Sequence, residues 1–165
     1  MMRRLLCVLA LLFVAACDTD EDFNPTPPTG PSIPTIGGTY SSSTMWQFTQ
    51  SPLGVFNCAG GVTITNQIGT SFTGTFFLRD SGCGDLSGSV TDGTIDTSGA
   101  VSFGLATPGT GANFPVSAFG CTYVSGDRVM TGTLIGNQLD VQARTEMDCG
   151  ASGPATLVLR LSGTR

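Results

Sequence analysis

From residue 38 onward, apolar and polar residues alternate in short runs separated by Gly, Asp, Asn and Ser. Because successive side chains of a β-strand point to opposite faces, this period of two predicts strands with one buried face. The wider spacing of an amphipathic helix is missing from these runs. The predicted inward rows are Trp46 and Phe48; Val62 and Ile64; Phe72, Phe76 and Leu78; Val101, Phe103 and Leu105; Leu139, Val141 and Ala143; and Leu157, Leu159 and Leu161.

Further runs at 86–96 and 128–135 bring the expected number of strands to eight. In the first run, Met45, Gln47 and Thr49 are expected on the outer face. Tight-turn signals, Ile68-Gly69, Ser98-Gly99 and Gly136-Asn137, each lie between two runs, which is typical of antiparallel hairpins.

Hairpins that follow one another without a crossover helix predict an all-β, up-and-down antiparallel barrel. Eight strands suffice to close such a barrel and remove its exposed edges. A two-sheet β-sandwich has a similar number of strands and is the alternative. The 128 residues from 38 to 165 (165 − 37 = 128) are enough for one domain with its own core.

The start of the chain has a different pattern. A basic head ending at Arg4 precedes an unbroken apolar run over residues 5–16, and Cys17 follows two alanines. As a helix, this run would reach about 18 Å, well short of the ~30 Å hydrocarbon core of a membrane. Residues 1–16 are therefore predicted to be an export signal rather than a membrane span.

The stretch Val14-Ala15-Ala16-Cys17 resembles the lipobox of bacterial lipoproteins. The resemblance implies that Cys17 is acylated, becomes the mature N-terminus and fixes the protein in the cell envelope, facing the periplasm or the exterior. An ordinary signal peptide cut nearby is the alternative. Asp18 follows the cysteine, and in enterobacterial lipoproteins an acidic residue there favours the inner membrane; the choice of membrane stays open.

Residues 17–37 follow as a segment rich in proline and acids. Residues 18–37 contain four acids and five prolines and show no apolar periodicity. Such a composition cannot bury enough surface to offset the entropy of ordering. We expect a spacer between the lipidated cysteine and the domain.

The net charge of the chain limits the classes of partner that it could bind. It has 7 Arg, no Lys, no His and 12 acids, so removal of Arg3 and Arg4 with the signal leaves 5 − 12 = −7. So few cations argue against nucleic acid as a partner and against binding anionic lipid headgroups by charge. Contact with the membrane is expected through the lipid anchor.

Four cysteines remain in the predicted domain, namely Cys58, Cys83, Cys121 and Cys149. An even number in an exported protein predicts disulfides. Three connectivities are possible, and Cys58–Cys83 with Cys121–Cys149 is preferred because each pair flanks one hairpin. The cysteines are isolated and the chain has no histidine, so neither a metal site nor a cofactor is expected.

Catalytic groups are scarce. Without histidine and lysine, the remaining option is a pair of carboxylates, Asp92 with Asp96 or Glu146 with Asp148. The first pair would lie ~13 Å apart on a continuous strand, and the second is expected to be solvated at a strand end. We predict that the protein is not an enzyme.

The eight-strand meander resembles the lipocalin and avidin group of ligand-binding barrels. Avidins line their biotin site with several tryptophans and this chain has one, so biotin binding is not carried over. Two functions follow: a structural or protein-interaction module that contacts another envelope protein, or a carrier of a small apolar ligand. A carrier would use Trp46, Phe72, Phe76 and Phe103, with room left by Gly74, Gly88, Gly104 and Thr131.

Overall fold

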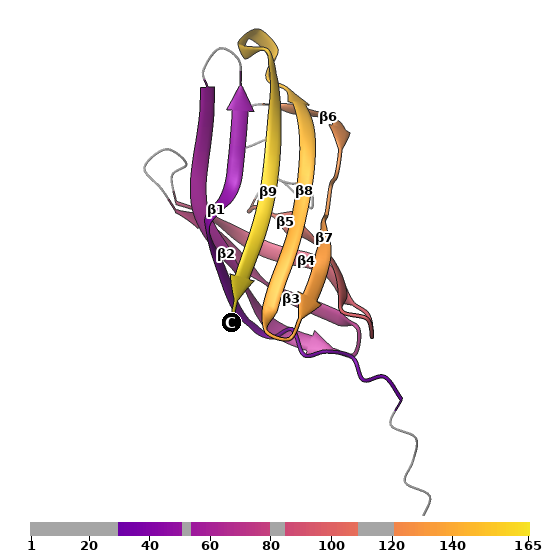
Figure 1. The fold of residues 1–165 in the computed structure, drawn as a ribbon. Helices are drawn as coiled ribbons and strands as arrows, with labels where there is room; N and C mark the ends of the chain where they lie inside the picture. Colours follow the sequence, from indigo (N-terminus) through magenta and orange to yellow (C-terminus); the bar gives the residue numbers. More distant parts are fainter. Residues whose placement is uncertain (1–29, 51–53, 80–84, 109–120) are drawn as a thin grey trace, which may run out of the picture. The chain divides into compact units, whose positions relative to one another are not determined.

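The alternating runs form long antiparallel strands that wrap around one core (Figure 1). The computed structural model describes residues 30–50, 54–79, 85–108 and 121–165, and Pro31–Arg165 form one compact unit. The strands are β1 (Gly38–Gln50), β2 (Gly54–Ile68), β3 (Ser71–Arg79), β4 (Leu86–Ile95), β5 (Ala100–Ala106), β6 (Thr122–Gly126), β7 (Met130–Ile135), β8 (Gln138–Asp148) and β9 (Pro154–Thr164).

The strands close into the predicted antiparallel barrel. Neighbours run in the order β8, β7, β5, β4, β3, β2, β1, β9, and β9 pairs back onto β8. The closing ladder is long and regular, from Gln138 opposite Thr164 to Asp148 opposite Pro154. The eight-stranded barrel is confirmed, and the two-sheet sandwich is wrong because this ladder joins the two ends of the sheet.

The ninth strand, β6, was not predicted. It pairs with the far part of β8, from Thr145 to Asp148, whereas β7 pairs with the near part, from Gln138 to Gln142. β6 and β7 therefore share one position in the barrel. All five residues of β6 are exposed, so its sequence carries no buried row that a period of two could reveal.

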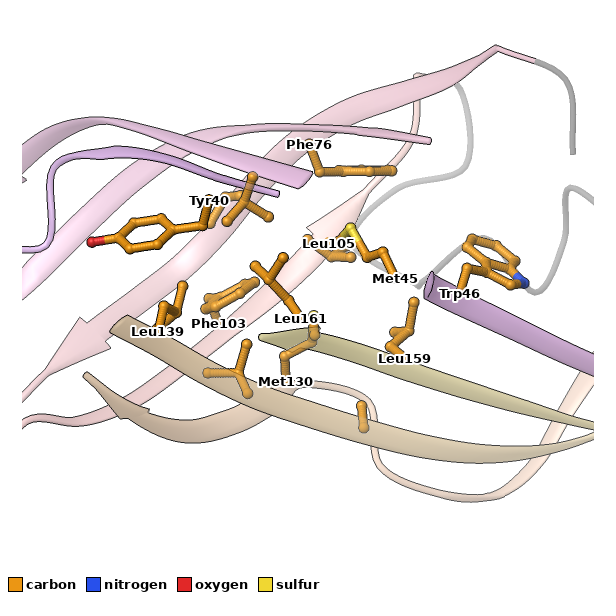
Figure 2. Packing of buried hydrophobic residues seen from close by; sticks show 14 of the residues in the cluster. Tyr40, Met45, Trp46, Phe76, Phe103, Leu105, Met130, Leu139, Leu159 and Leu161 are labelled. Atoms are coloured by element: carbon orange, nitrogen blue, oxygen red, sulfur yellow. The ribbon is translucent and has the colours of Figure 1, made fainter. Parts of the chain in front are cut away.

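The predicted inward rows are all buried and belong to one core. Figure 2 shows this interior, with Tyr40 toward one end, Trp46 toward the other, and Phe103, Leu105 and Leu161 between them. The placement of Met45 on the outer face is wrong: its side chain is fully buried. The reason is an irregularity of register between Ser42 and Trp46, which breaks the alternation and lets Met45 and Trp46 both enter the core.

The three predicted turns are confirmed, and all lie at one end of the barrel. β2 and β3 are joined by Gly69-Thr70, β4 and β5 by 96–99, and β7 and β8 by Gly136-Asn137. Each turn contains a glycine with positive φ, such as Gly136 at 60°, a conformation that costs L side chains energy. The β6–β7 connection lies midway along β8, and the strand ends joined by the remaining connections lie at the opposite end.

Candidate functional site

The four candidate ligand-binding residues lie in the packed core. Trp46 (β1), Phe72 and Phe76 (β3) and Phe103 (β5) are each at most 2% exposed. The Phe72 and Phe103 rings meet edge to face with their centroids 5.9 Å apart, a favourable aromatic geometry. The Phe72 and Phe103 rings are buried against each other, and all four aromatic side chains lie among the apolar side chains of the core.

Small residues on the neighbouring strand make room for these rings. A Cβ added to Gly88 would lie 2.6 Å from Cε1 of Phe76, and one added to Gly93 would lie 2.5 Å from the Phe72 ring. The rings therefore occupy the space that a side chain would fill. Gly104 and Thr131 do not add to this space, because a Cβ on Gly104 would meet the Thr91 hydroxyl and Thr131 is exposed.

The end of the expected spacer is built into the barrel. We call residues 31–37 the strap; Ile36 is fully buried and Ile33 packs against the core. The Gln67 side chain holds the strap through two of its backbone groups. Its Oε1 accepts a hydrogen bond from the Ile36 amide at 2.9 Å, and its Nε2 donates one to the Pro34 carbonyl at 2.9 Å. Two isoleucines within a proline-rich segment were the signal that the composition argument passed over.

Two further side chains hold the strap at the start of β1. The Tyr40 hydroxyl donates to the Ile36 carbonyl, and the Arg165 guanidinium donates to the Gly37 carbonyl at 2.6 Å. Burial raises the pKa of Tyr40 above its ordinary value of 10.0, and the nearby charge of Arg165 offsets part of this rise. The strap, the first strand and the last residue of the chain therefore meet at one end of the barrel, beneath which the strap runs in Figure 1.

One predicted disulfide is confirmed. Cys121, just before β6, is bonded to Cys149, just after β8, with their Cα atoms 4.0 Å apart. It ties β6 to β8 at the end of the barrel opposite the strap, beside the 3₁₀ helix η2 (Gly150–Ser152). Cys58 is also disulfide-bonded. Its expected partner Cys83, and the lipidation candidate Cys17, lie outside the described residues.

Three of the four carboxylates named as catalytic candidates, Asp96, Glu146 and Asp148, are engaged in local structure. Asp96 accepts hydrogen bonds from the Ser98 hydroxyl at 2.6 Å and from the Ser98 and Ala100 amides, and these bonds lower its pKa. Glu146 accepts hydrogen bonds from the Thr156 hydroxyl at 2.7 Å and from Arg144. Both bonds lower the pKa of Glu146, and the bond from Thr156 has the larger effect. Asp148 caps the amide of Gly150 at 2.9 Å.

The outer face of the barrel carries a shallow groove of about 440 Å³ near the turn between β4 and β5. Its lining includes Thr94, Ser102 and Thr131, which are register partners on three neighbouring strands. The only charged group among its lining residues is Asp96, whose carboxylate is already bonded within the turn. Within the described residues, no cluster of three or more His, Cys, Asp and Glu side chains is arranged to hold a metal ion.

Comparison with known proteins returned no matching family model, no matching curated protein and no matching solved structure. Among the described residues, no helix has both the length and the apolar character needed to cross a membrane. The fold and the candidate residues are therefore interpreted from their own chemistry.

Proposed function

We propose that this chain is a bacterial lipoprotein whose acylated Cys17 anchors a rigid, filled β-barrel in the cell envelope, where the barrel serves as a structural or protein-interaction module. The lipobox-like stretch that ends at Cys17 supports the anchor. Two or more acyl chains give durable attachment, because one chain binds a bilayer only marginally. A disulfide between Cys121 and Cys149 is in keeping with an oxidising compartment.

The packing of Phe72 against Phe103 is the observation that favours a module over a carrier. An eight-stranded barrel is just wide enough either to be filled by side chains or to hold one small ligand. Here the rings of Phe72, Phe76 and Phe103 take up the interior beside Gly88 and Gly93. A carrier would need that space for its cargo, so the functional surface of a filled barrel is its exterior.

The outward residues support a domain that works in water. On β8, the side chains that alternate with the core row are Asp140, Gln142, Arg144 and Glu146, and all four point away from the core. Polar side chains outside and apolar side chains inside suit a water-exposed module that is held at the membrane only by its tether.

Native mass spectrometry of the mature, acylated chain purified from its own cells tests the module against the carrier. We expect a single mass equal to the polypeptide plus its acyl groups. A stoichiometric additional small molecule that is lost on unfolding would contradict the filled barrel. A matched Phe103→Ala sample, in which a cavity has been opened, shows whether the method detects an apolar guest when space exists.

A further inference from the structure

The two most exposed large apolar side chains of the described residues both lie at the strap end of the barrel. Ile68 is 74% exposed next to the turn between β2 and β3, and Ile135 is 75% exposed next to the turn between β7 and β8. We call the three turns at this end, with Ile68 and Ile135, the strap rim. Because burying an apolar side chain away from water is favourable, contact with a surface that covers both isoleucines would be favourable.

The chain reaches the barrel at the same end. The strap, with which this compact unit begins, is held there by Gln67, Tyr40 and Arg165, so the predicted tether is joined to the barrel at this end. Only 12 residues, 18–29, separate Cys17 from Gly30. At 3.1–3.6 Å per residue, these span at most about 45 Å. If Cys17 is anchored, the strap rim is the part of the barrel tethered nearest the bilayer.

The placement of the two isoleucines suits a flat, extended surface. The β2–β3 and β7–β8 turns stand on opposite sides of the ring, with β4 and β5 between them one way and β1 and β9 the other way. The two side chains therefore lie apart on the rim and do not form one continuous patch. A plane that touches both lies across the end of the barrel, as a membrane surface would.

The charges at the strap rim do not oppose such contact. The turns Gly69-Thr70 and Gly136-Asn137 and the adjoining Gln67 and Gln138 are uncharged. Asp96 is negative in the third turn, and the positive Arg165 lies at the same end, bonded to Asn137. Because a tether raises the effective concentration of its two ends to the millimolar range, even weak apolar contact suffices.

We infer that the strap rim rests on the phospholipid bilayer through Ile68 and Ile135, so that the opposite, disulfide-bonded end of the barrel faces away from the membrane. This inference rests on the proposed anchoring through Cys17. It assigns the free end of the barrel, with β6, as the surface available to an envelope partner.

Nitroxide quenching in vesicles tests the contact. The mature acylated protein is placed in phosphatidylcholine vesicles that contain a lipid with a nitroxide near its headgroup. A fluorophore is attached either to Thr97→Cys, in the exposed third turn of the strap rim, or to Val124→Cys, in exposed β6 at the other end. We expect several-fold stronger quenching at position 97 than at position 124; equal or reversed quenching would overturn the inference.

A double variant isolates the isoleucines. Ile68→Ser with Ile135→Ser should reduce quenching of the Thr97→Cys label several-fold, whereas Val55→Ser with Val124→Ser should leave it unchanged. Unchanged quenching in the isoleucine variant would overturn the contact. Flotation of the protein with the vesicles is read separately: protein that fails to float contradicts the anchor, while protein that floats without quenching contradicts only the contact.

Discussion

The Tyr40 hydroxyl donates a hydrogen bond of 2.9 Å to the backbone carbonyl of Ile36, and both residues are fully buried. The bond joins the strap to the first strand inside the barrel end. The strap, which follows the predicted tether in the sequence, is thereby part of the core. The predicted tether is therefore joined directly to the folded barrel.

Tyr40→Phe should lower the free energy of unfolding by about 1–3 kcal/mol, because the Ile36 carbonyl would lose its partner in a buried place. Urea denaturation measures this change. The matched control is Tyr123→Phe, which removes a bond of 2.8 Å to the Gly126 carbonyl at an exposed site and should cost no more than about 0.5 kcal/mol. Equal losses in the two variants would contradict the role of Tyr40 in holding the strap.

The raised pKa of Tyr40 predicts a loss of stability at alkaline pH. In the folded state the phenol keeps its proton to a higher pH than in the unfolded state. Its contribution is therefore fully present below the unfolded pKa, about 10, and is lost as the pH rises through the folded pKa. Tyr40→Phe should have a flatter profile of unfolding free energy above pH ~10. An unchanged alkaline slope in this variant would assign the effect to another group.

Phe103→Ala tests the filled interior. The ring is fully buried and packs against Phe72, so its removal should cost about 3–5 kcal/mol through lost burial and a residual cavity. Phe77→Ala is the control on the outer face, where Arg79 lies 5.0 Å from the ring centroid, and should cost about 1 kcal/mol. Chemical denaturation of both variants gives the comparison. Similar costs would mean that the interior is loosely packed.

The disulfide at the free end should stabilise the domain by restricting the unfolded chain. Cys121 and Cys149 are 28 residues apart, which corresponds to about 3–4 kcal/mol on the chain-entropy model. Cys121→Ser with Cys149→Ser should lose this amount in urea denaturation without reductant. As a control, added reductant should lower the unfolding free energy of the wild-type protein more than that of the double variant, because the double variant has no bond left to reduce between these two positions. A loss below about 1 kcal/mol would show that the unfolded chain is already restricted in this region.

The barrel could be predicted from the sequence because its strands are buried on one face and exposed on the other. The row Leu157, Leu159 and Leu161 is buried, and Val158 and Arg160 are not. The predicted turns were right for a similar local reason, since a glycine with positive φ marks each of them. The hairpin order predicted a barrel but left the two-sheet sandwich open, and the β8–β9 ladder decides between them.

The parts that could not be predicted depend on contacts between distant residues. Met45 enters the core because β1 and β2 fall out of register between Ser42 and Trp46, which no alternation within β1 reveals. β6 is held by its pairing with β8 and by Cys121. The strap is ordered by Gln67, more than thirty residues away, so its proline-rich composition predicted a spacer throughout. The filled interior depends on which ring lies over which glycine, a relation between neighbouring strands.

Acylation of Cys17 is the central claim, because location, tether and orientation all depend on it. The most direct measurement is metabolic labelling of the producing cells with an alkyne-bearing palmitate, followed by click detection on the purified chain. We expect label on the wild-type protein in the membrane fraction and none on Cys17→Ser. An unlabelled wild-type chain, or equal label on Cys17→Ser, would contradict the account.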